Sequence, residues 1–431
     1  MNRSSIAIGV AAVLWAAGAG AAEFLYGVEV GVGTSDNIRR VPAAEESETI
    51  LTTGVEMAVQ REEGRLHANV DVDLSYNDYL DNAYDGEVTG MANADFRYLI
   101  VPGRFEWVLT DSFGQSEIDP FAASTPDNRE NINYLTTGPD FTLRLGSVGS
   151  LTLFGRYSAT QFEDSNFDDE RLLGGLSLGR DLSARSNVSL NVTAERVEFD
   201  DVTAGSNYDR QSAFLAYEIE GARTTIGAEA GYSEIHDEGT TSSSPLFELN
   251  ILRNLSQRSA LTFRGGVRSS DAASALRAGN ELGGGAPGGP DHTSSADPFE
   301  TRNASLGWQF TTLRTQFNLS AGFEEDRYES DDQLDRQRQY FQASASRQIT
   351  PRLTLRASGS IYSSDYDNSN QDDDETQLGL YLSWNASGRF FVELEIENFN
   401  RDSSNDLSEY NETRAFLRLA WRNSGGASGA R

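Results

Sequence analysis

Histidine is the side chain that most readily serves as a general base near neutral pH, and this 431-residue chain has three. His67 stands four positions before Asp71, and His236 begins HDEG, which we expect to start a loop and which also contains Asp237 and Glu238. An acid–base or nucleophilic site would need a partner within hydrogen-bonding reach of such a histidine. No nucleophile motif accompanies either residue. We therefore expect no catalytic residues and no enzyme activity.

Acid-rich segments offer the oxygen ligands that Ca²⁺ and Mg²⁺ prefer. They are residues 163–170 (EDSNFDDE), 330–335 (SDDQLD) and 368–375 (NSNQDDDE). None has the fixed ligand spacing of a dedicated loop, so we expect no resident metal or cofactor. Two interpretations stay open: solvated surface charge, or loosely bound Ca²⁺ or Mg²⁺ that bridges these segments to anionic lipopolysaccharide. The chain has no Cys, which excludes disulfides and thiolate ligands.

In the segments that must position these side chains, apolar and polar residues alternate with a period of two. In LHANVDVDLSY, residues 66–76, Leu66, Val70 and Val72 alternate with Asp71 and Asp73. Only an extended strand separates such a pattern into an apolar and a polar face. Similar runs of about 9 to 14 residues recur to the end of the chain, longer than the strands of most soluble proteins. We expect the aspartate face to line a wet interior and the leucine face to contact lipid.

The connections between these runs alternate between short and long. REEGR, VPGR and GSVGS are short. The long connections include DYLDNAYDGE, residues 114–130, HDEGTTSSS, residues 269–297 and SSDYDNSNQDDD. A soluble sandwich has no reason to keep this parity, but a membrane barrel with short periplasmic turns and long extracellular loops does. The sequence therefore predicts an all-β, transmembrane, up-and-down antiparallel β-barrel of about 20 strands, with 18 as the alternative.

The two ends of the chain fit an exported barrel. Residues 1–22 combine Arg3, an apolar run shorter than a spanning helix and a series of small residues, which is typical of a cleaved signal peptide. Residues 23–421 are expected to form the barrel and residues 422–431 a flexible tail. The run TRAFLRLAW before the tail resembles the closing strand of outer-membrane barrels. We expect the outer membrane of a Gram-negative bacterium.

The predicted inner face carries both signs of charge, and opposite charges on the first and last strands are expected to neutralise one another in part. An ordinary hydrated wall and a series of hydrogen-bonding groups for a polymer both fit this pattern. The predicted lumen-lining residues are Glu29, His67, Asp71, Asp73, Asp95, Arg97, Glu106, Arg264, Arg268, Arg356, Glu393, Glu395, Glu397, Arg414 and Arg418.

The segment 107–145, with PDNRENIN and TGPD, resembles the beta-barrel porin family found beside exopolysaccharide and PEP-CTERM (exosortase) gene clusters. The resemblance implies an outer-membrane barrel without catalytic residues that serves as a conduit for a secreted polysaccharide. Within this segment, Pro139 lies where a backbone hydrogen bond to the neighbouring strand is expected, but proline has no N–H to donate. The apolar residues also change from even-numbered positions, such as Ile132, to odd-numbered positions, such as Phe141. A strand bulge at Gly138 and Pro139 would explain both observations.

The function expected from these features is a passive channel for exopolysaccharide or other hydrophilic solutes. The alternative is a structural or adhesive barrel that binds lipopolysaccharide or a surface polymer without transport. Expected partners are membrane lipid, lipopolysaccharide, polysaccharide, periplasmic export machinery and the barrel assembly machinery. The net charge of −31 argues against nucleic acid.

The longest connection, residues 269–297, allows two arrangements. It contains ASALRAGNEL, which can form a short helix, and GGGAPGG, which can form tight turns. The segment either folds into the lumen and narrows it or remains a mobile surface loop.

Overall fold

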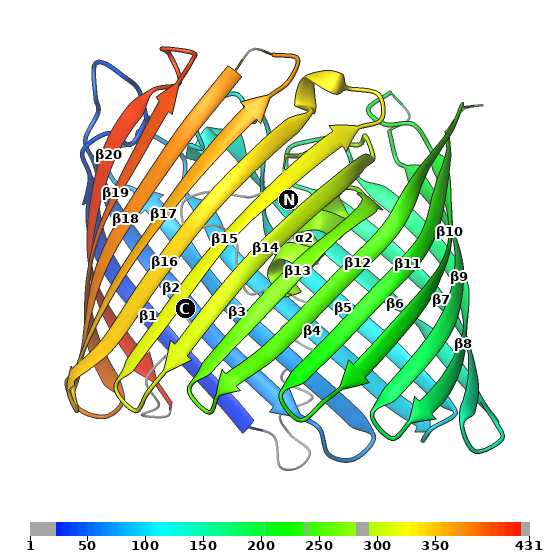
Figure 1. Cartoon of the computed structure of the whole chain (residues 1–431). Helices are drawn as coiled ribbons and strands as arrows, with labels where there is room; N and C mark the ends of the chain where they lie inside the picture. Colours follow the sequence, from blue (N-terminus) through cyan, green and yellow to red (C-terminus); the bar gives the residue numbers. More distant parts are fainter. Residues whose placement is uncertain (1–22, 202, 238–239, 282–292, 370, 424–431) are drawn as a thin grey trace.

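The computed structural model describes residues 23–201, 203–237, 240–281, 293–369 and 371–423 (Figure 1). The expected signal peptide and residues 424–431 of the expected tail lie outside the described residues. The strands are β1 (Glu23–Ser35), β2 (Glu48–Arg61), β3 (Leu66–Tyr79), β4 (Glu87–Val101), β5 (Phe105–Glu117), β6 (Arg129–Leu145), β7 (Gly149–Phe162), β8 (Asp169–Ser183), β9 (Ser186–Phe199), β10 (Tyr208–Glu220), β11 (Thr224–Asp237), β12 (Thr240–Ser256), β13 (Ser259–Ser270), β14 (Phe299–Thr311), β15 (Thr315–Tyr328), β16 (Arg336–Thr350), β17 (Leu353–Tyr366), β18 (Gln371–Asn385), β19 (Phe390–Ser403) and β20 (Tyr410–Arg422).

These strands form one closed antiparallel sheet of 20 strands, which confirms the predicted fold and the larger strand count. Each strand pairs with its neighbours in sequence, and β1 closes the barrel by pairing with β20 from Gly27–Arg422 to Ser35–Arg414. The described residues also form one α-helix, α2 (Ala272–Glu281), and two 3-10 turns, η1 (Pro126–Asn128) and η2 (Asp332–Leu334). Among the described residues, no helix is long and apolar enough to cross a membrane.

Register explains why the two faces of the sheet differ. Val55 of β2 is opposite Leu74 of β3, and the next pair along the ladder is Glu56 with Asp73. Successive side chains point to opposite faces, so the first pair faces outward and the second inward. The same alternation leaves Leu417 and Leu419 of β20 about half exposed on the outer surface. The aspartates of LHANVDVDLSY, Asp71 and Asp73, therefore face the interior, as expected.

Turn lengths follow the predicted parity, with two exceptions. Connections after even-numbered strands have at most four residues, such as 62–65 between β2 and β3. Connections after most odd-numbered strands have six or more residues, and they lie at the upper end in Figure 1. The exceptions are the β11–β12 and β17–β18 connections, predicted as long loops. There the backbone ladder continues farther than predicted, to the pairs Asp237–Thr240 and Tyr366–Gln371.

The bulge predicted at Gly138 and Pro139 is wrong. On either side of this dipeptide β6 keeps one register with β7, since residues 137 and 140 lie opposite residues 157 and 154. An inserted residue would shift that register. Alternation runs unbroken through β6, with Ile132 inward and Phe141 outward. The apolar parity changes because Ile132 contacts Leu276 of α2 inside the barrel, so that the inner face is apolar there.

Candidate transport lumen

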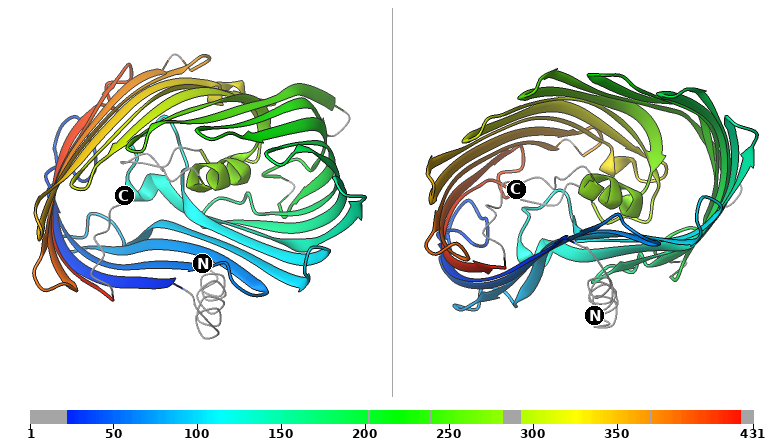
Figure 2. Two further views of the ribbon diagram at one scale, coloured as in Figure 1. Left: turned by 60° about the horizontal axis from the view of Figure 1, so that its bottom comes forward. Right: turned by 90° about the horizontal axis from the view of Figure 1, so that it is seen from below.

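Cross-strand register places all fifteen predicted lumen-lining residues on the inner face. The reference point is Ile132 of β6, which contacts α2, and both views of Figure 2 show α2 inside the ring of strands. Stepping from partner to partner around the closed sheet then assigns each side chain to a face. On the inner face lie Glu29 (β1), His67, Asp71 and Asp73 (β3), Asp95 and Arg97 (β4), Glu106 (β5), Arg264 and Arg268 (β13), Arg356 (β17), Glu393, Glu395 and Glu397 (β19), and Arg414 and Arg418 (β20).

The expected neutralisation between the first and last strands is present at Arg418. Arg418 Nε lies 3.8 Å from Glu29 Oε1, and the same guanidinium pairs with Glu395. Glu393 instead pairs with Arg422, at 3.0 Å. Long side chains reach the diagonal neighbour, so the partner is not always the residue directly opposite.

The other predicted lumen-lining charges either pair with a nearby residue or lie apart from one another on the wall. Arg97 lies 3.4 Å from Glu106, Arg268 lies 2.7 Å from Glu248, and Arg414 lies 2.6 Å from Glu412. Arg264 and Arg356 lie on β13 and β17, at separate places on the wall. The set thus lines a broad surface and does not converge on one point.

The two histidines considered as bases face opposite sides of the wall. His67 is opposite Arg97 of β4 on the inner face. His236 lies within β11, opposite Thr241 of β12, on the outer face. The interpretation of HDEG as the start of a loop is therefore wrong, because β11 extends through Asp237.

The connection 269–297 folds into the barrel over its described part. Ala272 and Leu276 of α2 pack against Ile132 of β6 and Phe162 of β7. These contacts cross the lumen, because α2 follows β13 on the opposite side of the ring (Figure 2). Farther along, the backbone of Thr293 bridges to Glu117 of β5. The helix predicted from ASALRAGNEL is present, and the infolded arrangement is the one that the structure has.

A buried carboxylate fixes the start of α2. Asp271 Oδ1 lies 2.9 Å from Arg171 of β8, and its Oδ2 lies 2.9 Å from Arg210 of β10. The same carboxylate accepts a hydrogen bond from the backbone N–H of Ser274, as an N-cap does. Burial alone would raise the pKa of Asp271, but the two guanidinium groups outweigh it and hold the pKa well below its ordinary value.

A second connection, residues 118–128, crosses the lumen in the other direction; we call it the crossing loop. Its backbone carbonyls accept hydrogen bonds from the far wall: Ala122 from Arg401 of β19, Phe121 from Gln371 of β18, and Ser124 from Arg40. The ring of Phe121 also packs edge-on against Tyr366 of β17. Backbone carbonyls tied to buried donors at several points hold the loop across the mouth of the barrel.

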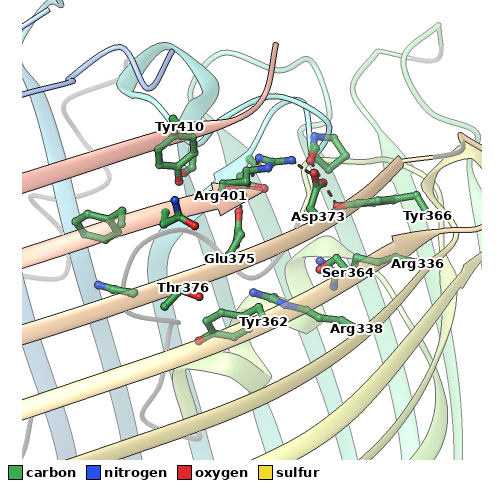
Figure 3. A pocket seen from close by; sticks show the side chains of 16 residues that line it. Arg336, Arg338, Tyr362, Ser364, Tyr366, Asp373, Glu375, Thr376, Arg401 and Tyr410 are labelled. Carbon is green, nitrogen blue, oxygen red and sulfur yellow. Dashed lines mark hydrogen bonds and ion pairs between the residues drawn. The ribbon is translucent and has the colours of Figure 1, made fainter. Parts of the chain in front are cut away.

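Between the crossing loop and the wall formed by β16–β20 lies a polar recess (Figure 3). It encloses about 680 Å³, including the part that is open to the lumen. Charges of both signs balance in its lining, which contains the guanidinium groups of Arg336, Arg338 and Arg401 and the carboxylates of Glu117, Asp373 and Glu375. Aromatic rings lie among them: Tyr362, Tyr366, Phe399 and Tyr410.

Several buried atoms of this recess have no hydrogen-bond partner among the described residues, and three of them belong to β18 and β19. They are Asp373 Oδ1, Gln377 Oε1 and Arg401 Nε. All three side chains are nearly inaccessible to solvent, with 4%, 8% and 4% of their residues' surface exposed. A buried polar atom that stays unpaired costs about 1–3 kcal/mol. The recess therefore presents two acceptors and one donor that a polar ligand can satisfy.

The acidic segments use several carboxylates within the protein. Asp168 accepts the backbone N–H of Phe162, Asp335 accepts that of Tyr328, and Asp373 pairs with Arg401 at 2.7 Å. In the part of the chain that the structure describes, no group of three or more His, Asp or Glu side chains could hold a metal ion.

A closed sheet with an apolar outer face and a charged inner face defines a transmembrane β-barrel. The family model described as "Putative beta-barrel porin 2" matches residues 260–423, from β13 to the end of β20, and confirms the resemblance to barrel porins. The segment 107–145 lies outside this match. No curated protein matches the chain.

Two solved structures, of a receptor and of a transporter, are similar to this chain. A variant of the ferric enterobactin receptor PfeA from Pseudomonas aeruginosa aligns with a TM-score of 0.50 and 11% identity, over 94% of this chain and 81% of that chain. The FrpB iron transporter from Neisseria meningitidis, in an apoprotein form, aligns with a TM-score of 0.47 and 10% identity, over 92% and 81%. At such identities the likeness concerns the fold alone.

Sequence reasoning missed the residues that hold the two infolded connections. Arg171, Arg210 and Arg401 are far in sequence from the segments they bind, so no local pattern links them. Asp271 is different, because an aspartate directly before AASALRA is a helix N-cap signal. Attention to that signal would have favoured an ordered helix over a mobile loop.

Proposed function

We propose that this chain is an outer-membrane channel that passes hydrophilic solutes, with exopolysaccharide as the polymer it conducts. The barrel fold and the porin family model support a channel that does not act as an enzyme. The recess beneath the crossing loop carries the proposal for a carbohydrate: it combines unpaired buried donors and acceptors with aromatic rings and balanced charge.

The chemistry of the recess favours hydroxyl groups. A sugar hydroxyl both donates and accepts, so neighbouring hydroxyls of one saccharide can satisfy Asp373 Oδ1, Gln377 Oε1 and the Nε–H of Arg401 together. The rings of Tyr366 and Tyr410 supply apolar faces for the C–H side of a sugar. Because the three arginines and three carboxylates of the lining cancel, a neutral saccharide fits better than a polyanion.

Stacked pairs of guanidinium groups and rings continue from the recess toward the periplasmic end. Arg338 lies 4.2 Å from the ring centre of Tyr362, and Arg356 lies 4.1 Å from that of Tyr381. Nearest the periplasm, Arg422 lies 4.7 Å from the ring of Phe391. Such pairs fix the rings in place while leaving polar edges toward the lumen. They support a path along which a polymer exchanges many weak contacts in sequence.

The test is single-channel recording in planar bilayers with maltoheptaose, a neutral glucose oligomer, on one side. We expect transient blockades whose frequency rises with sugar concentration, and shorter blockades in Gln377→Ala. The matched control is Gln316→Ala on β15, an inner-face glutamine outside the recess, which should leave the blockades unchanged. Steady conductance without blockades at any sugar concentration would contradict a carbohydrate path.

The competing function is a structural or adhesive barrel without transport. The observation in its favour is that α2 and the crossing loop both span the lumen. It predicts no conductance above the bare bilayer and retention of a surface polymer on cells. The same recordings therefore separate the two functions.

The remaining assignments follow from this proposal. The protein resides in the outer membrane of a Gram-negative bacterium, where the barrel assembly machinery inserts it. Its outer face contacts lipid and lipopolysaccharide, and its periplasmic end receives polymer from export machinery. No cofactor takes part; Ca²⁺ or Mg²⁺ at the acidic connections would act only as a bridge to lipopolysaccharide.

A further inference from the structure

The wall has a seam between β4 and β5 at its extracellular end. The ladder of these two strands runs from Val101–Phe105 to Ala92–Phe113 and goes no further. Residues 87–91 of β4 pair only with β3, and residues 114–116 of β5 pair only with β6, whereas Glu117 pairs with β6 and also bridges to Thr293 of the infolded connection. We call this unpaired stretch the β4–β5 seam. Along it the edges of β4 and β5 have no backbone hydrogen bonds to each other, and at its outer end the carbonyl of Glu117 accepts the N–H of Ser294 at 2.7 Å instead.

A glutamine side chain spans the seam. Gln115 would be the register partner of Gly90 if the ladder continued. Its side-chain amide takes that role: Oε1 accepts the N–H of Gly90 at 3.1 Å, and Nε2 donates to the C=O of Gly90 at 3.0 Å. The strands are therefore held apart by the length of a side chain. Glu87 and Arg129, paired at 2.8 Å, form the second link across this region.

Both strands are shaped for this separation. Gly90 has φ +115°, and a Cβ there would lie 2.0 Å from the carbonyl oxygen of Asp73, so only glycine fits. On the other side, the end of β5 is drawn inward by the infolded connection, since Ser116 bonds Ser294 at 2.6 Å. The seam follows from two independent features, one on each strand.

The seam lies at the level where the outer face changes from apolar to polar. On β6 the outward side chains from Leu145 up to Leu135 are apolar except for Thr137, whose hydroxyl is hydrogen-bonded to β5, and the next one is Asn133. Asn133 donates to the outward carboxylate of Asp111 at 2.7 Å. Polar outward side chains of this kind mark the head-group region of the bilayer, and not its hydrocarbon core.

Two buried polar atoms beside the seam have no hydrogen-bond partner among the described residues: Asn93 Oδ1 and Arg129 Nε. One is an acceptor and the other a cationic donor. A phosphate oxygen would satisfy the guanidinium, and a hydroxyl would satisfy the amide. Lipid head groups carry both kinds of group.

We propose that the β4–β5 seam is a lateral port through which the phosphate- and hydroxyl-bearing head group of an outer-leaflet lipid enters the lumen. The amide of Gln115 is its latch, because two side-chain hydrogen bonds break more easily than a continuous backbone ladder. The port is independent of what passes along the barrel axis.

The experiment uses the full-length protein in vesicles that contain phosphatidylcholine with a nitroxide on its head group. The chain has no Cys, so Met91→Cys and Ser320→Cys each accept one bimane label. Met91 faces the lumen just beyond the last β4–β5 pair, whereas Ser320 faces the lumen on β15, whose ladders to β14 and β16 are continuous there. We expect severalfold stronger quenching of the label at 91 than at 320.

The latch is then tested in the same labelled chain. Gln115→Ala should increase quenching at position 91, and the control Gln342→Ala, which removes an amide from the continuous part of the wall, should not. Equal quenching at 91 and 320 in the otherwise unchanged barrel would overturn the proposal, whether or not the Gln115→Ala protein folds. Quenching at 91 that is stronger but insensitive to Gln115→Ala would overturn the role of the latch.

Discussion

Two arcs of the barrel differ in how completely their neighbouring strands pair. From β14 to β20 the ladders are continuous nearly to the extracellular rim, and the inner face carries stacked arginine and aromatic side chains. From β4 to β6 the ladder opens at the β4–β5 seam, and the ends of the strands lean into the lumen (Figure 2). In the proposed function the first arc supplies a surface for solutes. The second arc carries the crossing loop and contacts α2, which follows β13. A barrel that only enclosed water would need neither a surface for solutes nor a loop across its lumen.

The largest effect is expected where the infolded helix is tied to the wall. Asp271→Ala removes the carboxylate between Arg171 and Arg210 and leaves both guanidinium groups buried without it. Breaking such a buried pair typically costs about 3–5 kcal/mol, enough to release α2 from the wall. Protease cleavage at Arg277 in intact vesicles should become rapid. The control is Asp297→Ala, whose carboxylate accepts hydrogen bonds from the backbone of Ser330 and Asp331; unchanged cleavage in Asp271→Ala would contradict the role of the buried carboxylate.

A smaller effect is expected at the crossing loop. Arg401→Ala removes the hydrogen bond to Ala122 and the pair with Asp373, but Gln371 and Arg40 still hold the loop. We expect larger open-channel noise with little change in mean conductance. The control is Arg264→Ala, which removes an inner-face arginine of β13 outside the recess. Noise that is equal in both variants would mean that Arg401 does not restrain the loop.

The pH dependence follows from Asp271. Its pKa is lowered in the folded protein, so the stabilisation is present above the ordinary aspartate pKa of about 3.9 and is lost as pH falls through the lowered value. Conductance should therefore stay constant from neutral pH down to mildly acidic pH, and rise only in strong acid when α2 detaches. A rise already near pH 6 would show that another group controls the helix.

The smallest effect is ion selectivity. The chain carries 66 acidic and 35 basic residues, whereas the wall near β20 pairs its charges. We expect a mild cation preference that is set at the mouth and weakened by salt. Reversal potentials under a salt gradient measure it. A clear anion preference would instead assign control of entry to the arginines of the wall.

Sequence reasoning succeeded where a repeated pattern carried the information. Alternation and turn parity predicted a 20-stranded barrel and the inward side of Asp71, Arg264 and Glu395, because a period of two leaves only one choice of face. It failed at Ile132, where an apolar residue faces inward to meet α2, and at Gln115, whose amide bridges a seam. Both depend on contacts between segments far apart in the chain, which no local period encodes.

The central claim is that the infolded connection after β13 narrows a conducting lumen. The most direct measurement is single-channel recording after replacement of residues 272–296 by a short Gly-Ser turn, beside the unchanged protein in the same bilayer. The account predicts a severalfold larger and steadier conductance, with leakage of bulky antibiotics into cells that carry the variant. An unchanged conductance would contradict it, because it would show that α2 does not lie in the path of the ions.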